Sequence, residues 1–226
     1  MTATSRPSPV PSHLPPRGRR ALIMEPVLEV FDATGFRAWP VADLPAGHLL
    51  PLSGDLSMPE TGTAVATLAE YASRPTGDGV LAADPAACLR GLTDAELLLP
   101  PGGLRVRDPG TGAEIRPGCC CGVEDWREWW VLVDGGEPWL GHDAARIEFA
   151  GADVRLWPVV GVAQAAPRLP VEIPLAELPA MLRATQELLV GFLDRVEQWA
   201  LSYAPEPAAR TRDKVDRDLG ITASGR

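Results

Sequence analysis

The chain of 226 residues is 46% hydrophobic, which is enough for one sizeable core but not for two full domains. Residues 1–24 carry four arginines and no acid, and residues 205–226 carry five basic and four acidic side chains, so the formal net charge of −9 leaves −14 on residues 25–204. This acidic body excludes nucleic-acid binding through a basic face, and no apolar run is long enough for a membrane span.

We predict a disordered tail over residues 1–24, a single α+β domain over residues 25–204 and a second disordered tail over residues 205–226. The first tail is rich in proline, serine and arginine, and the last segment is polar, so neither offers much apolar surface to bury. The basic start is followed by too few apolar residues for a secretion signal. We therefore expect a cytoplasmic protein, with translation beginning at Met1 or at Met24.

Three pairs of alternating apolar and polar segments predict β-hairpins, because each pair is joined by a short turn that contains aspartate and glycine. These hairpins are expected over residues 28–39, 104–116 and 146–157. Shorter apolar runs at residues 80–83 and 171–173 predict two further strands. Antiparallel hairpins of this kind are expected to form one sheet.

Helical spacing of apolar residues predicts a short helix over residues 63–73, and capping signals predict two short helices between residues 85 and 99. A Trp-rich helix is expected over residues 123–133 and the longest helix over residues 179–203. A heptad-spaced apolar seam over residues 178–203 predicts that the long helix covers the sheet together with the Trp-rich helix. Self-association through this seam is the alternative.

The stretch from Cys119 to Asp143 holds three of the four cysteines, four of the seven tryptophans and one of the three histidines. An α-helix would place Trp126 and Trp130 on one side, with Trp129 displaced by about 100° from Trp130. One face of a short helix rarely buries so many large rings, so we expect an exposed acidic surface that recognises a protein partner. Its residues are Glu124, Asp125, Trp126, Glu128, Trp129, Trp130 and Trp139.

The run of three cysteines is the second candidate site. In an extended chain Cys119 and Cys121 point to one side and Cys120 to the other. Cys119, Cys121 and His142 could then hold a zinc ion, although the paired spacings of common zinc modules are missing. No other cofactor is expected. The alternatives are small thiols packed at a tight junction and a nucleophilic Cys121 at the start of the Trp-rich helix.

The same stretch resembles a group of actinobacterial proteins without an established activity in three motifs, residues 119–122, 124–129 and 138–143. In its build, an acidic α+β domain with a long final helix, the chain is also similar to bacterial immunity proteins. The leading hypothesis is thus a non-enzymatic, immunity-like protein-binding module. The alternative is a metal-binding or redox-sensing protein centred on residues 119–121, and an enzyme ranks below both.

Overall fold

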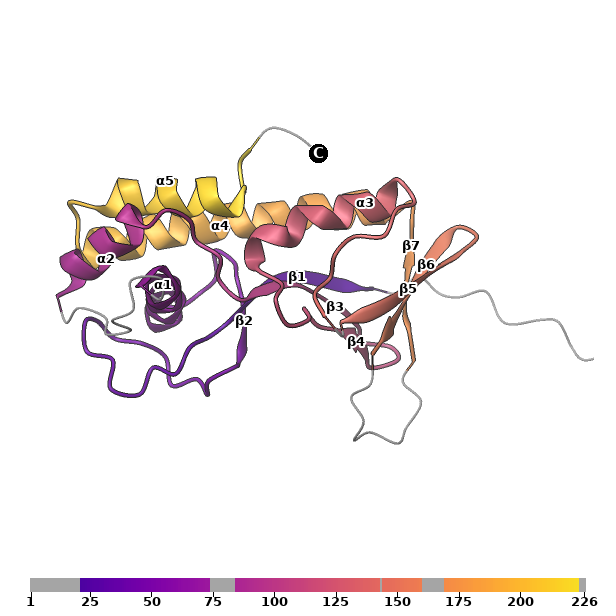
Figure 1. Cartoon of the computed structure of the whole chain (residues 1–226), viewed down its shortest axis with the longest axis horizontal. Coiled ribbons are helices and arrows are strands. Elements are labelled where there is room, and N and C mark those ends of the chain that lie inside the picture. The colour runs from indigo at the N-terminus through magenta and orange to yellow at the C-terminus, as the bar shows by residue number, and fades with distance from the viewer. Residues whose placement is uncertain (1–20, 74–83, 143, 160–168, 224–226) are drawn as a thin grey trace, which may run out of the picture.

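The computed structural model describes residues 21–73, 84–142, 144–159 and 169–223. Its strands form two antiparallel sheets, not the single sheet expected from the hairpins, and helices complete an α+β fold (Figure 1). Most of the tail expected at residues 1–24 lies outside the described residues, as does the strand expected at residues 80–83.

The first sheet has the strand order β2-β1-β3-β4 and the second has the order β5-β6-β7. The strands are β1 (Ile23–Glu29), β2 (Leu49–Pro51), β3 (Gly102–Asp108), β4 (Ala113–Ile115), β5 (Ala145–Ala150), β6 (Asp153–Pro158) and β7 (Val171–Pro174). The predicted hairpins over residues 104–116 and 146–157 are confirmed as β3–β4 and β5–β6, because in both cases a tight local turn sets the pairing.

The hairpin predicted over residues 28–39 is wrong, because β1 pairs with β2 and β3 instead of with residues 36–39. Residues 36–39 are irregular and place Trp39 in the core. The Trp39 ring meets the Trp199 ring edge-on at 4.9 Å, and its Nε1 donates a hydrogen bond to the Gly62 carbonyl (2.8 Å). Burial of this indole therefore outweighs the local alternating pattern.

The helices are α1 (Met58–Ser73), α2 (Pro85–Asp94), the 3₁₀-helix η2 (Val123–Trp129), α3 (Trp130–Val133), α4 (Leu178–Tyr203) and α5 (Ala208–Leu219). In α1 the helix begins five residues before the predicted start at residue 63. Ser57 and Glu60 form a reciprocal cap there, with the Ser57 amide donating to Glu60 Oε2 (2.8 Å) and the Glu60 amide to Ser57 Oγ (3.3 Å).

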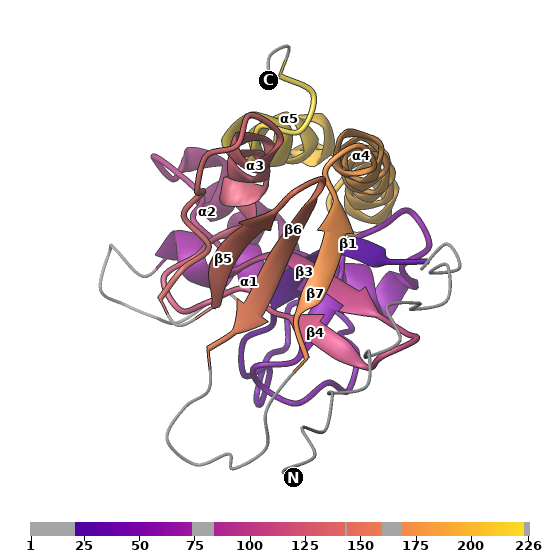
Figure 2. The ribbon, with the colours of Figure 1, turned by 90° about the vertical axis from the view of Figure 1, so that its right-hand side faces the viewer.

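Residues 205–226 were expected to be a disordered tail, and the structure corrects this for the described residues up to 223, because α5 packs beside α4 and also contacts α2 and η2 (Figure 2). Lys214, whose side chain is 3% exposed, forms an ion pair with Asp218 (2.8 Å) and donates to the Ala95 carbonyl (2.6 Å). Asp218 also accepts from the Leu98 amide (2.9 Å). These contacts bind the segment that follows α2, so the second short helix expected before residue 99 does not form.

The long helix predicted over residues 179–203 is confirmed as α4, which begins one residue earlier and ends at the predicted residue. Its apolar seam is fully buried within the chain from Leu178 to Trp199, and Tyr203 at its end is half-buried. The structure therefore gives the seam a role in the core and lends no support to self-association through it. None of the helices in the described part of the chain has the length and apolarity that a membrane crossing requires.

Candidate functional site

The Trp-rich segment does not form the exposed surface expected of it. Trp126 is 1% exposed and Trp129 is 4% exposed. Val123–Trp129 is a 3₁₀-helix, in which side chains three residues apart lie on the same face. The two rings therefore align on the inward face, whereas an α-helix would set them about 60° apart.

The inward face of η2 holds the end of α5. Trp126 Nε1 donates a hydrogen bond to the Leu219 carbonyl (3.0 Å). The Arg127 guanidinium lies 4.5 Å from the centre of the Trp126 ring and donates to the carbonyls of Gly220 (2.6 Å) and Ile221 (3.1 Å). These carbonyls follow the last turn of α5, so the central part of the motif acts as a cap for another helix.

The acids at the start of η2 are half-buried. Asp125 Oδ2 accepts a hydrogen bond from the Gly122 amide (3.1 Å), which caps the helix start. Glu124 folds back over Gly122, and its Oε2 is buried without a hydrogen-bond partner. Burial raises the pKa of Glu124 to about 7, with a further contribution from the charge of Asp125.

Of the seven residues proposed for the acidic Trp-bearing surface, Glu128 and Trp139 are exposed, while Trp130 is half-buried. Trp139 has an exposed fraction of 49% and meets the His142 ring edge-on at 4.9 Å. Of the expected surface, Glu128 and Trp139 are thus the exposed residues, and Trp139 is the most exposed aromatic side chain among the seven.

The three cysteines do not lie on an extended chain. The Cys121 amide donates to the Gly118 carbonyl (3.4 Å) across a turn, and Cys120 adopts a positive φ of 62°, which is uncommon for a residue other than glycine. This turn leaves Cys119 and Cys120 exposed and Cys121 half-buried. The alternation expected from an extended chain is therefore wrong.

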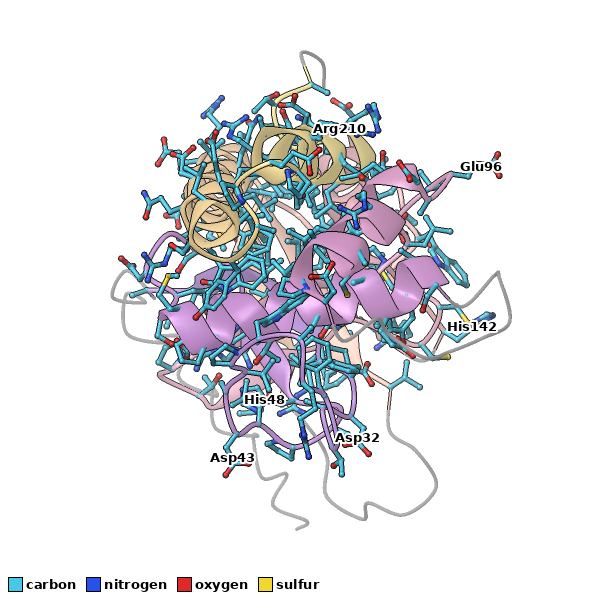
Figure 3. All side chains as sticks on the ribbon, turned by 90° about the vertical axis from the view of Figure 1, so that its left-hand side faces the viewer. Asp32, Asp43, His48, Glu96, His142 and Arg210 are labelled. Carbon is cyan, nitrogen blue, oxygen red and sulfur yellow. The ribbon has the colours of Figure 1, made fainter. Side chains whose placement is uncertain are left out.

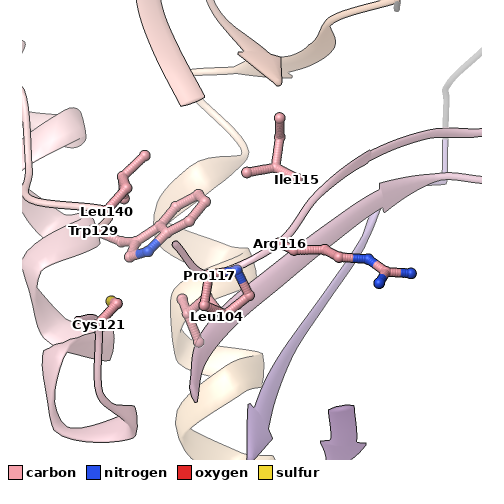
Figure 4. Close-up of a pocket in the computed structure, with 7 residues that line it drawn as sticks. All are labelled: Leu104, Ile115, Arg116, Pro117, Cys121, Trp129 and Leu140. Carbon is pink, nitrogen blue, oxygen red and sulfur yellow. The ribbon is translucent and has the colours of Figure 1, made fainter. Parts of the chain in front are cut away.

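Cys121 faces a small pocket together with Trp129 and Leu140 (Figure 4). The pocket has room for about one water molecule. Burial raises the pKa of the Cys121 thiol to about 12, and the charge of Asp125 adds to the shift. Such a thiol stays protonated at neutral pH when no metal ion is bound, which disfavours Cys121 as a nucleophile. Its sulfur is also not among the ligand atoms that gather at His142.

Cys119, Cys120 and His142 come together instead. One ligand atom from each side chain lies within 4.8 Å of the others, and all three side chains are exposed. Figure 3 shows His142 at the edge of the molecule. In the part of the chain that the structure describes, this is the single group of three or more histidine, cysteine or carboxylate side chains with that spacing.

Two backbone hydrogen bonds clamp the cysteine turn against the histidine segment. The Gly118 amide donates to the Leu140 carbonyl (3.0 Å), and the His142 amide donates to the Cys119 carbonyl (3.0 Å). A Cβ at residue 118 would overlap the His142 carbonyl oxygen, so the approach requires glycine there. Gly141 has a φ of 86°, which turns the second segment toward the first.

Two sulfur ligands and one imidazole nitrogen form a soft donor set that suits Zn²⁺ or Cu⁺. The ligand set predicted from the sequence, Cys119, Cys121 and His142, shares Cys119 and His142 with this group, which holds Cys120 in place of Cys121. The positive φ of Cys120 decides between them, and no feature of the three identical side chains marks which one adopts it.

The chain matches no protein-family model, no curated protein and no solved structure. The resemblance to an actinobacterial group and to immunity proteins therefore stays a prediction. Function has to be inferred from the side chains themselves.

Proposed function

We propose that the protein binds a soft metal ion, Zn²⁺ before Cu⁺, through Cys119, Cys120 and His142. The observation that supports this is the spacing of the three ligand atoms, which lie within 4.8 Å of one another. Zinc bonds of about 2.3 Å to sulfur and about 2.0 Å to nitrogen place ligands of one tetrahedral ion roughly 3.5 to 4 Å apart. Small side-chain rotations are enough to reach that geometry.

The clamp between the two segments supports binding by ordering the site before the ion arrives. Because the hydrogen bonds at Gly118 and His142 already hold the loops together, little backbone freedom has to be lost on binding. Thiolates persist in a reducing compartment, so the proposal places the protein in the cytoplasm. Binding releases protons from the ligands, and metal affinity should therefore fall as the pH is lowered.

Titration of the reduced protein with Co²⁺, an optical substitute for Zn²⁺, tests the proposal. We expect one ion per chain, with an absorption band from thiolate-to-metal charge transfer, and displacement of Co²⁺ by Zn²⁺. Cys119→Ser, Cys120→Ser and His142→Ala should each weaken binding by more than about a hundredfold, since each removes a direct ligand.

Cys121→Ser is the matched control, because it changes the neighbouring thiol that faces the interior. Its affinity should equal that of the wild type. Equal loss in all three cysteine variants would reject the assigned ligand set, and the absence of any thiolate band would reject metal binding at this site.

Protein recognition, including an immunity-like role, is the second candidate function. It is favoured by one observation, the 49% exposure of Trp139 on an acidic chain, because exposed tryptophans are enriched in binding hot spots. Once a protein partner has been identified, Trp139→Ala should weaken its binding by about 2 kcal/mol or more, and Glu128→Gln by less. Unchanged affinity in both variants would remove this candidate.

A further inference from the structure

The described residues give the candidate ion three ligands, all on exposed side chains. A structural zinc site is closed by four protein ligands, whereas a site with three protein ligands keeps one position for water or an incoming group. We infer that this position accepts a thiolate from a second polypeptide and that the protein passes its ion to that partner. The inference rests on the proposed metal binding and names its partner class.

The surroundings of the site favour an approach by a large ligand. The turn at residues 118–121 directs two thiols outward and the third inward, so the ion would lie on the solvent side of the backbone. Trp139 packs edge-on against His142 and is 49% exposed, which leaves an aromatic surface beside the ion for the partner to contact.

Soft ions prefer thiolates, so an acceptor that competes with two thiolates and one imidazole needs three or four soft ligands of its own. A thiol of the acceptor loses its proton to solvent, its thiolate bonds to the ion at the open position, and the bound water leaves. His142, the neutral ligand, is displaced by a second acceptor thiolate. Cys119 and Cys120 take up protons as the remaining acceptor thiolates replace them, and the metal keeps its oxidation state throughout.

The test is a stopped-flow measurement on the full chain loaded with one equivalent of Co²⁺. The acceptor is a synthetic metal-free peptide with four cysteines in two C-x₂-C pairs, mixed in excess over a tenfold range of concentration. Direct transfer predicts that the observed rate constant rises roughly tenfold over this range, because the acceptor enters before the ion leaves. Cys121→Ser should give the same second-order rate constant as the wild type.

A rate constant that does not depend on acceptor concentration would overturn the inference, because it would mean that the ion leaves a closed site before capture. A peptide with serine in place of its cysteines should leave the ion on the protein, and loss of the ion to that peptide would also overturn it. Failure of the proposed function itself looks different, since the protein would then retain no ion before mixing.

Discussion

The helix Val123–Trp129 and the loops on either side of it contain equally unusual side chains but differ in what those side chains contact. The helix directs Trp126 and Trp129 inward and holds the end of α5. The loops direct Cys119, Cys120 and His142 into solvent. The difference arises from the backbone, since a 3₁₀ period gathers the rings on one face and a single left-handed residue turns a thiol outward. A concentration of rare residues therefore does not by itself mark a binding surface.

The largest effect that this comparison predicts is a loss of stability on substitution of a buried ring in η2. Trp126→Ala removes a fully buried indole and its hydrogen bond to the Leu219 carbonyl, so the free energy of unfolding should fall by about 3 to 5 kcal/mol. Urea denaturation followed by circular dichroism measures this change. A loss below about 1 kcal/mol would mean that the ring is not part of the core.

The next effect concerns the loops, where Gly118→Ala should act on metal binding. A methyl group at this position overlaps the His142 carbonyl and separates His142 from the two cysteines, so we expect Co²⁺ affinity to fall by about 10- to 100-fold. Gly91→Ala is the control, because its Cβ would enter open space on α2. Wild-type affinity for Gly118→Ala would show that the clamp does not order the ligands.

A pH effect separates two of the three acids of the helix, Glu124 and Glu128. The pKa of Glu124 is raised from 4.5 to about 7 in the folded protein, so the unfolded chain loses this proton first as the pH rises. Glu124 should therefore lower the free energy of unfolding progressively between about pH 4.5 and pH 7, by about 2 kcal/mol after allowance for solvent screening, and have no effect below that window.

Glu124→Gln should remove this decline and stabilise the protein above pH 7, whereas Glu128→Gln, at an exposed position, should not change the profile. Denaturation curves of the three proteins from pH 4 to pH 8 measure the difference. Parallel profiles for the wild type and Glu124→Gln would contradict the burial of this carboxyl group.

The smallest effect is expected at Trp139, the exposed ring of the loops. Trp139→Ala removes an edge-on contact with His142, and aromatic pairs contribute about 0.5 to 1.5 kcal/mol, so Co²⁺ affinity should weaken by roughly two- to tenfold. The free energy of unfolding should fall by no more than about 1.5 kcal/mol, well below the loss expected for Trp126→Ala. A large loss of stability would place this ring in the core with Trp126.

The sequence predicted the elements whose information is local. Turn chemistry located the hairpins β3–β4 and β5–β6, and apolar periodicity located α4. The partners of β1 were missed because Leu49–Pro51 and Gly102–Asp108 are separated from it by long segments, and strand pairing at that distance leaves no local pattern. The helix α5 was missed because it contains few apolar residues, and because two of its charged residues, Lys214 and Asp218, are buried as an ion pair.

The candidate site was half predictable for a similar reason. Soft ligands in one short stretch indicated a metal site that includes Cys119 and His142. Assignment of the third ligand required the φ of Cys120, and assignment of Trp126 and Trp129 required knowing which face of η2 turns toward the end of α5. Both are backbone choices that tertiary contacts impose, and side-chain identity encodes them weakly.

The hydrogen bonds between η2 and the end of α5 have a consequence for the order of folding. The Trp126 indole meets its carbonyl partner across 93 residues, and the Leu98 amide meets Asp218 across 120. Contacts of such range require closure of long loops, so the hairpins and α1 can form well before them. Docking of η2 and of the segment near residue 98 against α5 should therefore be a late step, and until it occurs the backbone near residue 98 and the inner side of η2 should remain hydrated.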